Sequence, residues 1–117
     1  SVSCAQNLNV QKNQSTFNSK GFAYVYNNQD FINKTISSKF DNSLILLAHN
    51  KLRPGTLIKI INPQTNDVIV LKNSKRVKYQ DFYKVLITEA LSKKINLNPN
   101  LPIVEINEIK KNNFKIK

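Results

Sequence analysis

Few side chains in this chain could take part in acid–base chemistry, because its 117 residues include one histidine and seven carboxylates. His49, beside the Pro-Gly turn, has an imidazole that can bind a ligand or relay a proton near neutral pH. Asp41 directly follows Phe40, and Asp81 lies in the aromatic stretch 79–83. A carboxylic acid at either position could protonate a leaving group. We therefore take His49, Asp41 and Asp81 as candidate catalytic residues. The structural alternatives are that His49 supports the turn, that Asp41 caps a loop and that Asp81 pairs with a nearby lysine at the surface.

A basic and aromatic segment covers residues 72–83. It contains Lys72, Lys75, Arg76 and Lys78, followed by Tyr79, Phe82 and Tyr83. Aromatic faces stack on sugar rings and also on nucleic-acid bases, and lysines attract carboxylates or phosphates. The alternative is a solvated loop with some rings in the core. The sequence has no Cys, His and carboxylate cluster with metal-ligand spacing and no glycine-rich phosphate loop, so we expect neither a metal nor a cofactor.

The composition predicts one domain with an anionic partner. The formal net charge is +11, and 40% of the residues are hydrophobic, which suffices for one core. The charge favours a partner such as nucleic acid, a membrane surface or a cell-wall polymer, although codon bias in an AT-rich genome would also enrich lysine. The lysines are spread along the chain, which argues against a dedicated nucleic-acid arm. No run of 18 apolar residues exists that could span a bilayer.

Short strands dominate the pattern. We expect strands over residues 21–27, 56–62, 68–72, 81–86 and 101–109, one helix over 89–95 with Thr88 as N-cap, and loops over 28–41 and 73–80. The apolar run 43–49 fits a strand or a helical turn equally well. The only glycines, Gly21 and Gly55, are expected where the backbone needs positive φ or a close approach. Short strands with one short helix indicate a small β-barrel.

The ends of the chain have a different composition. Residues 1–19 are rich in Asn, Gln and Ser and predict a polar tether, and residues 111–117 form a basic tail. Ser1 in place of methionine suggests a processed chain. Cys4 is the only cysteine, so it has no partner for an internal disulfide.

Five stretches of the chain resemble one known family. Residues 21–26 (Gly-Phe-Ala-Tyr-Val-Tyr) resemble the Gly-x-Ala-Ser-Trp-Tyr strand of RlpA-like (rare lipoprotein A) domains. Residues 35–41 resemble the family's Thr-Ala-x-Gly-Glu-x-Phe-Asp motif, and residues 48–56 resemble its Ala-His-x-x-Leu-Pro-Phe-Gly-Thr motif. Residues 58–70 resemble its strand–loop–strand segment, and residues 85–90 resemble its Ile-Asp-Leu-Ser-x-Ala motif. The resemblance covers residues 20–110.

The resemblance implies a mainly β fold: a small six-stranded double-psi β-barrel with one or two short helices. It also implies the cell envelope as location and peptidoglycan as partner. The family's enzymes are lytic transglycosylases, which cleave glycan strands between N-acetylmuramic acid and N-acetylglucosamine without water. Cys4 resembles the lipidated cysteine of a bacterial lipoprotein, which implies a periplasmic protein anchored to the outer membrane. We expect a monomer.

The acidic positions of the family are replaced here. Ser38 stands where the family has its catalytic Glu, and Leu86 where it has a third acidic residue. The family's Asn-Asp-Arg-Gly turn aligns with Asn73-Ser74-Lys75-Arg76, so Ser74 replaces the catalytic Asp. Of the polar set, His49 alone remains. The resemblance suggests ligand-binding roles for Ser38, Ser74, Lys75, Arg76 and Tyr79.

Three functions follow as alternatives. The first is a cell-envelope protein that binds peptidoglycan glycan strands with weak or lost lytic activity. The second is an active lytic transglycosylase that uses a displaced acid, Asp41 or Asp81. The third is a basic nucleic-acid-binding barrel, although we expect no nucleic acid as partner.

Overall fold

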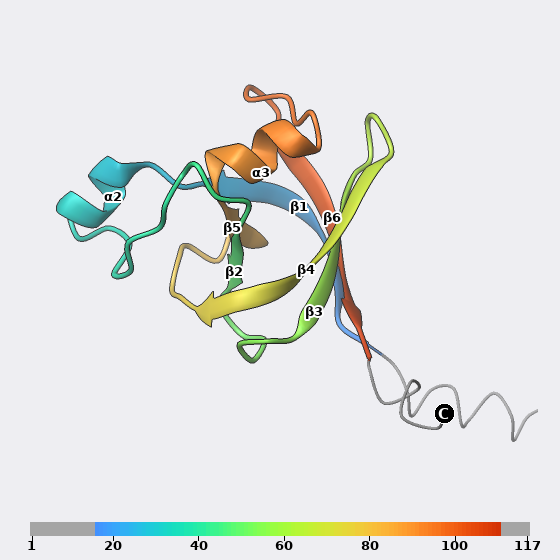
Figure 1. Ribbon diagram of the computed structural model, residues 1–117, viewed down its shortest axis with the longest axis horizontal. Helices are drawn as coiled ribbons and strands as arrows, with labels where there is room; N and C mark the ends of the chain where they lie inside the picture. Colours follow the sequence, from blue (N-terminus) through green and yellow to red (C-terminus); the bar gives the residue numbers. More distant parts are fainter. Residues whose placement is uncertain (1–15, 111–117) are drawn as a thin grey trace, which may run out of the picture.

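The structure is a computed structural model that describes residues 16–110, and its main feature is a closed β-barrel (Figure 1). In chain order the elements are β1 (Asn18–Val25), α2 (Asn28–Ile32), β2 (Leu47–His49), β3 (Leu57–Asn62), β4 (Asp67–Arg76), β5 (Val85–Ile87), α3 (Glu89–Lys94) and β6 (Ile103–Ile109). The strands close in the order β1-β5-β2-β4-β3-β6. Cys4, the basic tail 111–117 and most of the expected tether lie outside the described residues.

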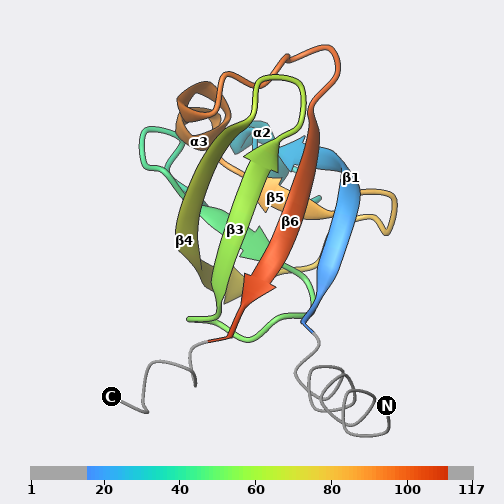
Figure 2. The same cartoon turned by 90° about the vertical axis from the view of Figure 1, so that its right-hand side faces the viewer.

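The barrel mixes parallel and antiparallel pairs. β1 runs parallel to β5, and β2 runs parallel to β4. The remaining neighbours are antiparallel, and Figure 2 shows β4, β3, β6 and β1 side by side on one wall. The predicted fold class is confirmed: the chain is mainly β, with a closed six-stranded mixed barrel and two short helices. This arrangement is compatible with a double-psi barrel.

The β3–β4 hairpin follows directly from the alternating sequence. Ile58 and Ile60 are fully buried, because alternate side chains of a strand point to the barrel interior. Strand pairing runs from Leu57 opposite Lys72 to Asn62 opposite Asp67. β4 continues to Arg76 and does not stop at residue 72 as expected, because its second half pairs with β2.

Helix α3 closes one end of the barrel (Figure 1). The Thr88 side chain caps it, as predicted, by accepting a hydrogen bond from the Leu91 amide. Leu91 and Ile95 join the main core, which also contains Ala23, Leu47, Ile58, Ile60, Val85, Ile87, Leu97, Val104 and Ile106. A second apolar cluster contains Tyr26, Ile36, Phe40, Ala48, Val77 and Leu86.

Two further sequence expectations about local structure were wrong. Residues 28–41 were expected to be loop, but α2 forms there because Asn27 and Asp30 make a reciprocal capping box. None of its residues is buried, so no hydrophobic periodicity marks it. The strand expected over 81–86 is confined to β5, which begins at Val85 after a turn at residues 81–82. In the described part of the chain neither helix is long and apolar enough to cross a membrane.

Candidate functional site

A cleft of about 350 Å³ opens where β2 ends. We call it the His49 cleft; its lining includes Phe17, His49, Lys51, Asp81, Tyr83 and Lys84. Two of the three candidate catalytic residues, His49 and Asp81, therefore share one cleft. The third, Asp41, lines a different hollow with Tyr26, Lys39 and Phe40.

His49 is held in one orientation by the chain that follows it. Its side chain is only 2% exposed, and Nδ1 accepts hydrogen bonds from the amides of Lys51 (3.0 Å) and Leu52 (3.2 Å). An imidazole nitrogen that accepts carries no proton, so the proton of the neutral ring is on Nε2. Burial, with a smaller contribution from Lys51, lowers the pKa of His49 to about 4. At neutral pH the ring is therefore uncharged, with its proton on Nε2.

Asn73 on β4 fixes the backbone around His49. Its side-chain oxygen accepts from the His49 amide at 2.8 Å, and its Nδ2 donates to the carbonyls of Leu52 (2.9 Å) and Arg53 (3.3 Å). Asn73 is 1% exposed, and these bonds satisfy its buried amide. Asn73 was not predicted as a site residue, although it alone keeps its place in the aligned Asn-Asp-Arg-Gly turn.

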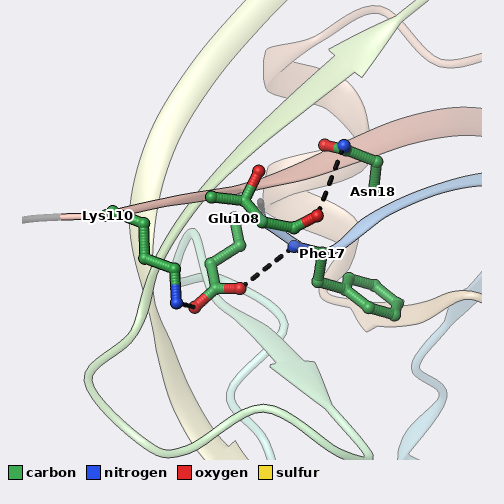
Figure 3. A network of polar contacts seen from close by, with 5 residues as sticks. Phe17, Asn18, Glu108 and Lys110 are labelled. Carbon is green, nitrogen blue, oxygen red and sulfur yellow. Dashed lines mark hydrogen bonds and ion pairs between the residues drawn. The ribbon is translucent and has the colours of Figure 1, made fainter. Parts of the chain in front are cut away.

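Phe17 packs against the His49 ring. The two rings meet edge to face, with centroids 5.0 Å apart and planes at 74°. Figure 3 shows how Glu108 of β6 fixes Phe17: its Oε1 accepts from the Phe17 amide at 3.1 Å. The Glu108 amide donates to the Phe17 carbonyl at 2.8 Å, and Lys110 lies 3.5 Å from Oε2. Sequence reasoning missed both Phe17 and Glu108, because only the β1–β6 pairing brings them together.

Tyr79 braces the cleft through its hydroxyl group. The hydroxyl accepts from the Asn50 amide at 3.0 Å and donates to the Lys84 carbonyl at 3.3 Å. Burial raises the pKa of Tyr79 to about 12, so the phenol stays protonated in any ordinary buffer. The hydroxyl thus joins the two chain segments that carry His49 and Asp81.

Asp41 occupies an exposed turn. Its Oδ1 accepts from the Ser43 amide at 2.9 Å and from the Ser43 hydroxyl at 2.6 Å. These bonds keep the pKa of Asp41 below its ordinary value, so it is ionised at neutral pH. This is the geometry of a loop cap, and a general acid needs the opposite pKa shift.

The residues that the resemblance suggests as ligand contacts come from two places. Ser74, Lys75 and Arg76 end β4, where Arg76 pairs in register with His49. The Ser74 hydroxyl donates to the Leu47 carbonyl at 2.8 Å. Lys75 Nζ lies 4.9 Å from the centre of the Phe40 ring. Phe40 follows half-buried Ser38 by two residues. The end of β4 thus brings two cations close to His49 and Phe40.

Comparisons with known proteins give no family for this chain. No family model matches the sequence. No curated protein matches it either. Among residues 16–110, no group of three His, Cys, Asp or Glu side chains could hold a metal ion.

Proposed function

We propose that this chain is an RlpA-like double-psi β-barrel of the bacterial cell envelope that binds peptidoglycan glycan strands, with weak or lost lytic activity. The observation that carries the proposal is the His49 cleft, in which a fixed, neutral histidine shares the lining with two lysines and Asp81. The three positions that are acidic in the family are occupied here by Ser38, Ser74 and Leu86. Leu86 is fully buried in the second apolar cluster.

The chemistry of the cleft favours binding over cleavage. Glycosidic cleavage needs an acid that is still protonated at working pH and a second group that stabilises the oxocarbenium-like state. Asp41 lies in another hollow and is ionised, and neutral His49 with a pKa of about 4 is a weak proton donor. A neutral N–H donor suits the acetamido and hydroxyl oxygens of an amino sugar.

Unneutralised cations supply the electrostatic part of the proposal. The only ion pair recorded between described residues joins Lys110 to Glu108, and neither residue lines the cleft. Lys51 and Lys84 line the cleft itself, and Lys75 and Arg76 stand at the neighbouring strand end. Peptide stems of peptidoglycan carry carboxylates, which such cations attract.

The remaining features of the proposal concern location and assembly. We propose a periplasmic monomer attached to the outer membrane through a lipid on Cys4. Labelling with a radioactive fatty acid in cells that express the full gene tests this attachment. Label that persists in a Cys4→Ser variant would contradict it.

Retention on purified sacculi tests binding through the cleft. The double variant Lys51→Gln with Lys84→Gln should lower retention several-fold. The matched control is Lys93→Gln with Lys94→Gln, which removes the same charge from α3 and should change retention little. Equal losses from both pairs would show that retention reflects net charge alone.

A displaced acid is the second candidate, and one observation favours Asp81 for it: Asp81 shares the cleft with His49. This alternative predicts anhydro-muropeptides in a sacculus digest. Their release should be abolished by Asp81→Asn and retained in Asp41→Asn.

A further inference from the structure

The His49 cleft has a neighbour on the far side of Tyr83. A groove of about 550 Å³ is lined by residues that include Phe22, Tyr24, Asp30, Phe82 and Tyr83. We call it the aromatic groove. Tyr83 belongs to the lining of both hollows, so they adjoin along this ring. A ligand longer than one sugar could therefore occupy both.

The aromatic groove contains a connected set of rings. Phe22 and Phe82 stack with centroids 5.2 Å apart and planes at 29°. Tyr83 meets Phe82 edge to face at 5.1 Å and Tyr24 edge to face at 4.9 Å. Phe82 is nevertheless 61% exposed, the most exposed aromatic ring among the large hydrophobic side chains of residues 16–110. More than half of Phe82 is therefore open to a ligand, although the residue also packs against Phe22 and Tyr83.

The turn that carries Phe82 is anchored on both sides. The Tyr83 amide donates to the Gln80 carbonyl at 3.0 Å, and the Lys84 amide donates to the Phe22 carbonyl at 2.9 Å. Tyr79 adds its hydroxyl bond to the Lys84 carbonyl. The rings are thus positioned before any ligand arrives, which reduces the entropy lost on binding.

Each of the two hollows also contains a carboxylate. Asp30 lines the aromatic groove and Asp81 lines the His49 cleft. Carboxylates accept hydrogen bonds from sugar hydroxyls but repel a phosphate backbone. The C–H face of a pyranose ring also fits the negative face of an aromatic ring.

We propose that the aromatic groove is a second sugar subsite, in which the Phe22–Phe82 pair stacks on a pyranose ring of the glycan strand that enters the His49 cleft. This proposal rests on the proposed function. It adds that the footprint crosses Tyr83 and covers more than one sugar.

Binding of soluble, peptide-free glycan strands tests the subsite. The assay titrates size-fractionated strands, prepared from sacculi by removal of the peptides, into the full chain by calorimetry. Phe82→Ala should weaken binding of long strands roughly tenfold, about the loss of one aromatic contact. The matched control is Phe31→Ala, an exposed aromatic ring on α2 that lines neither hollow. Affinity should rise with strand length in the wild type, and this rise should be smaller in Phe82→Ala.

The outcomes separate this inference from the function on which it rests. If sacculi and strands bind the wild type but Phe82→Ala binds equally well, the subsite is wrong and the proposed function stands. If the wild type binds neither sacculi nor strands, both are wrong. Tighter, Phe82-dependent binding of oligo(dT) would overturn the glycan assignment in favour of a nucleic acid.

Discussion

His49 shows how burial changes the chemistry of a residue that the sequence alone marks as reactive. Its ring lies against Phe17, and Nδ1 is occupied by two backbone amides. Both features favour the neutral form, so the ring is uncharged near pH 7 and carries its proton on Nε2. A proton relay would need a pKa closer to neutrality.

The same pKa predicts a loss of stability in mild acid. The unfolded chain takes up a proton near the ordinary pKa of 6.5, whereas folded His49 does so only near 4. The stabilisation is therefore fully present above pH 6.5 and is lost as the pH falls toward 4, by about 2–3 kcal/mol between pH 7 and 4.5. Urea unfolding at the two pH values measures it. His49→Asn keeps an acceptor near Nδ1 and removes the titration, so its loss should be under about 1 kcal/mol. An equal loss in both proteins would contradict the assignment.

Asn73 should matter more for stability than the candidate ligand residue next to it. Asn73→Ala leaves the His49 amide and the Leu52 carbonyl without partners in a buried place, which we expect to cost about 2–4 kcal/mol. Ser74→Ala removes one partly buried hydroxyl bond and should cost about 1 kcal/mol. Urea unfolding at pH 7 compares them. Equal costs would show that Asn73 does not organise the cleft.

Individual site residues differed in how far the sequence could predict them. His49 and Asp81 were selected from residue type, and the structure places both in one cleft. Asn73, Phe17 and Glu108 were missed because their roles depend on contacts across the fold. The Phe17–Glu108 bond spans 91 positions and the His49–Asn73 bond spans 24. Type and spacing in a single sequence do not reveal such pairings.

At the scale of elements, prediction succeeded where local patterns and tertiary contacts agree. The β3–β4 hairpin alternates clearly, and α3 begins at its predicted cap, Thr88. α2 was missed because its capping box stabilises a helix without a buried face. β4 was predicted too short because its second half, polar and basic, is held by pairing with β2 and not by its own periodicity.

The turn after β2 connects the elements of the site, and Gly55 provides its backbone conformation. Its φ is +88°, and its amide donates to the Asn73 carbonyl at 2.8 Å. A Cβ would meet no atom within 4 Å, so the cost of Gly55→Ala comes from the dihedral angle alone. We expect about 1 kcal/mol from thermal unfolding, with a smaller loss for Gly55→Asn, since Asn tolerates positive φ better. No loss in Gly55→Ala would mean that the turn relaxes to another conformation.

The whole molecule is a small barrel with far more positive than negative charge. A formal net charge of +11 and a single recorded ion pair within residues 16–110 leave most cations available to an anionic polymer. Charge by itself does not identify that polymer, and the fold class does not either. The combination of a neutral histidine, adjacent aromatic rings and two carboxylates in the hollows is what favours a glycan strand.

Salt dependence of retention tests this combination in the intact protein. Retention by sacculi should fall by less than about tenfold between 50 and 200 mM NaCl, because stacking and neutral hydrogen bonds are not screened. A protein held mainly through phosphates would lose about a thousandfold or more over that range. Sedimentation at a series of salt concentrations measures the slope. A loss of about a thousandfold or more over this range would favour the nucleic-acid alternative.

Incubation of the wild-type protein with purified sacculi, followed by sedimentation and mass spectrometry of the supernatant, tests the central claim most directly. We predict that the protein sediments with the sacculi more than a charge-matched control protein does, and that the supernatant contains no anhydro-muropeptides above background. Abundant anhydro-muropeptides would show an active transglycosylase. Protein that stays in the supernatant with the control would contradict peptidoglycan binding altogether.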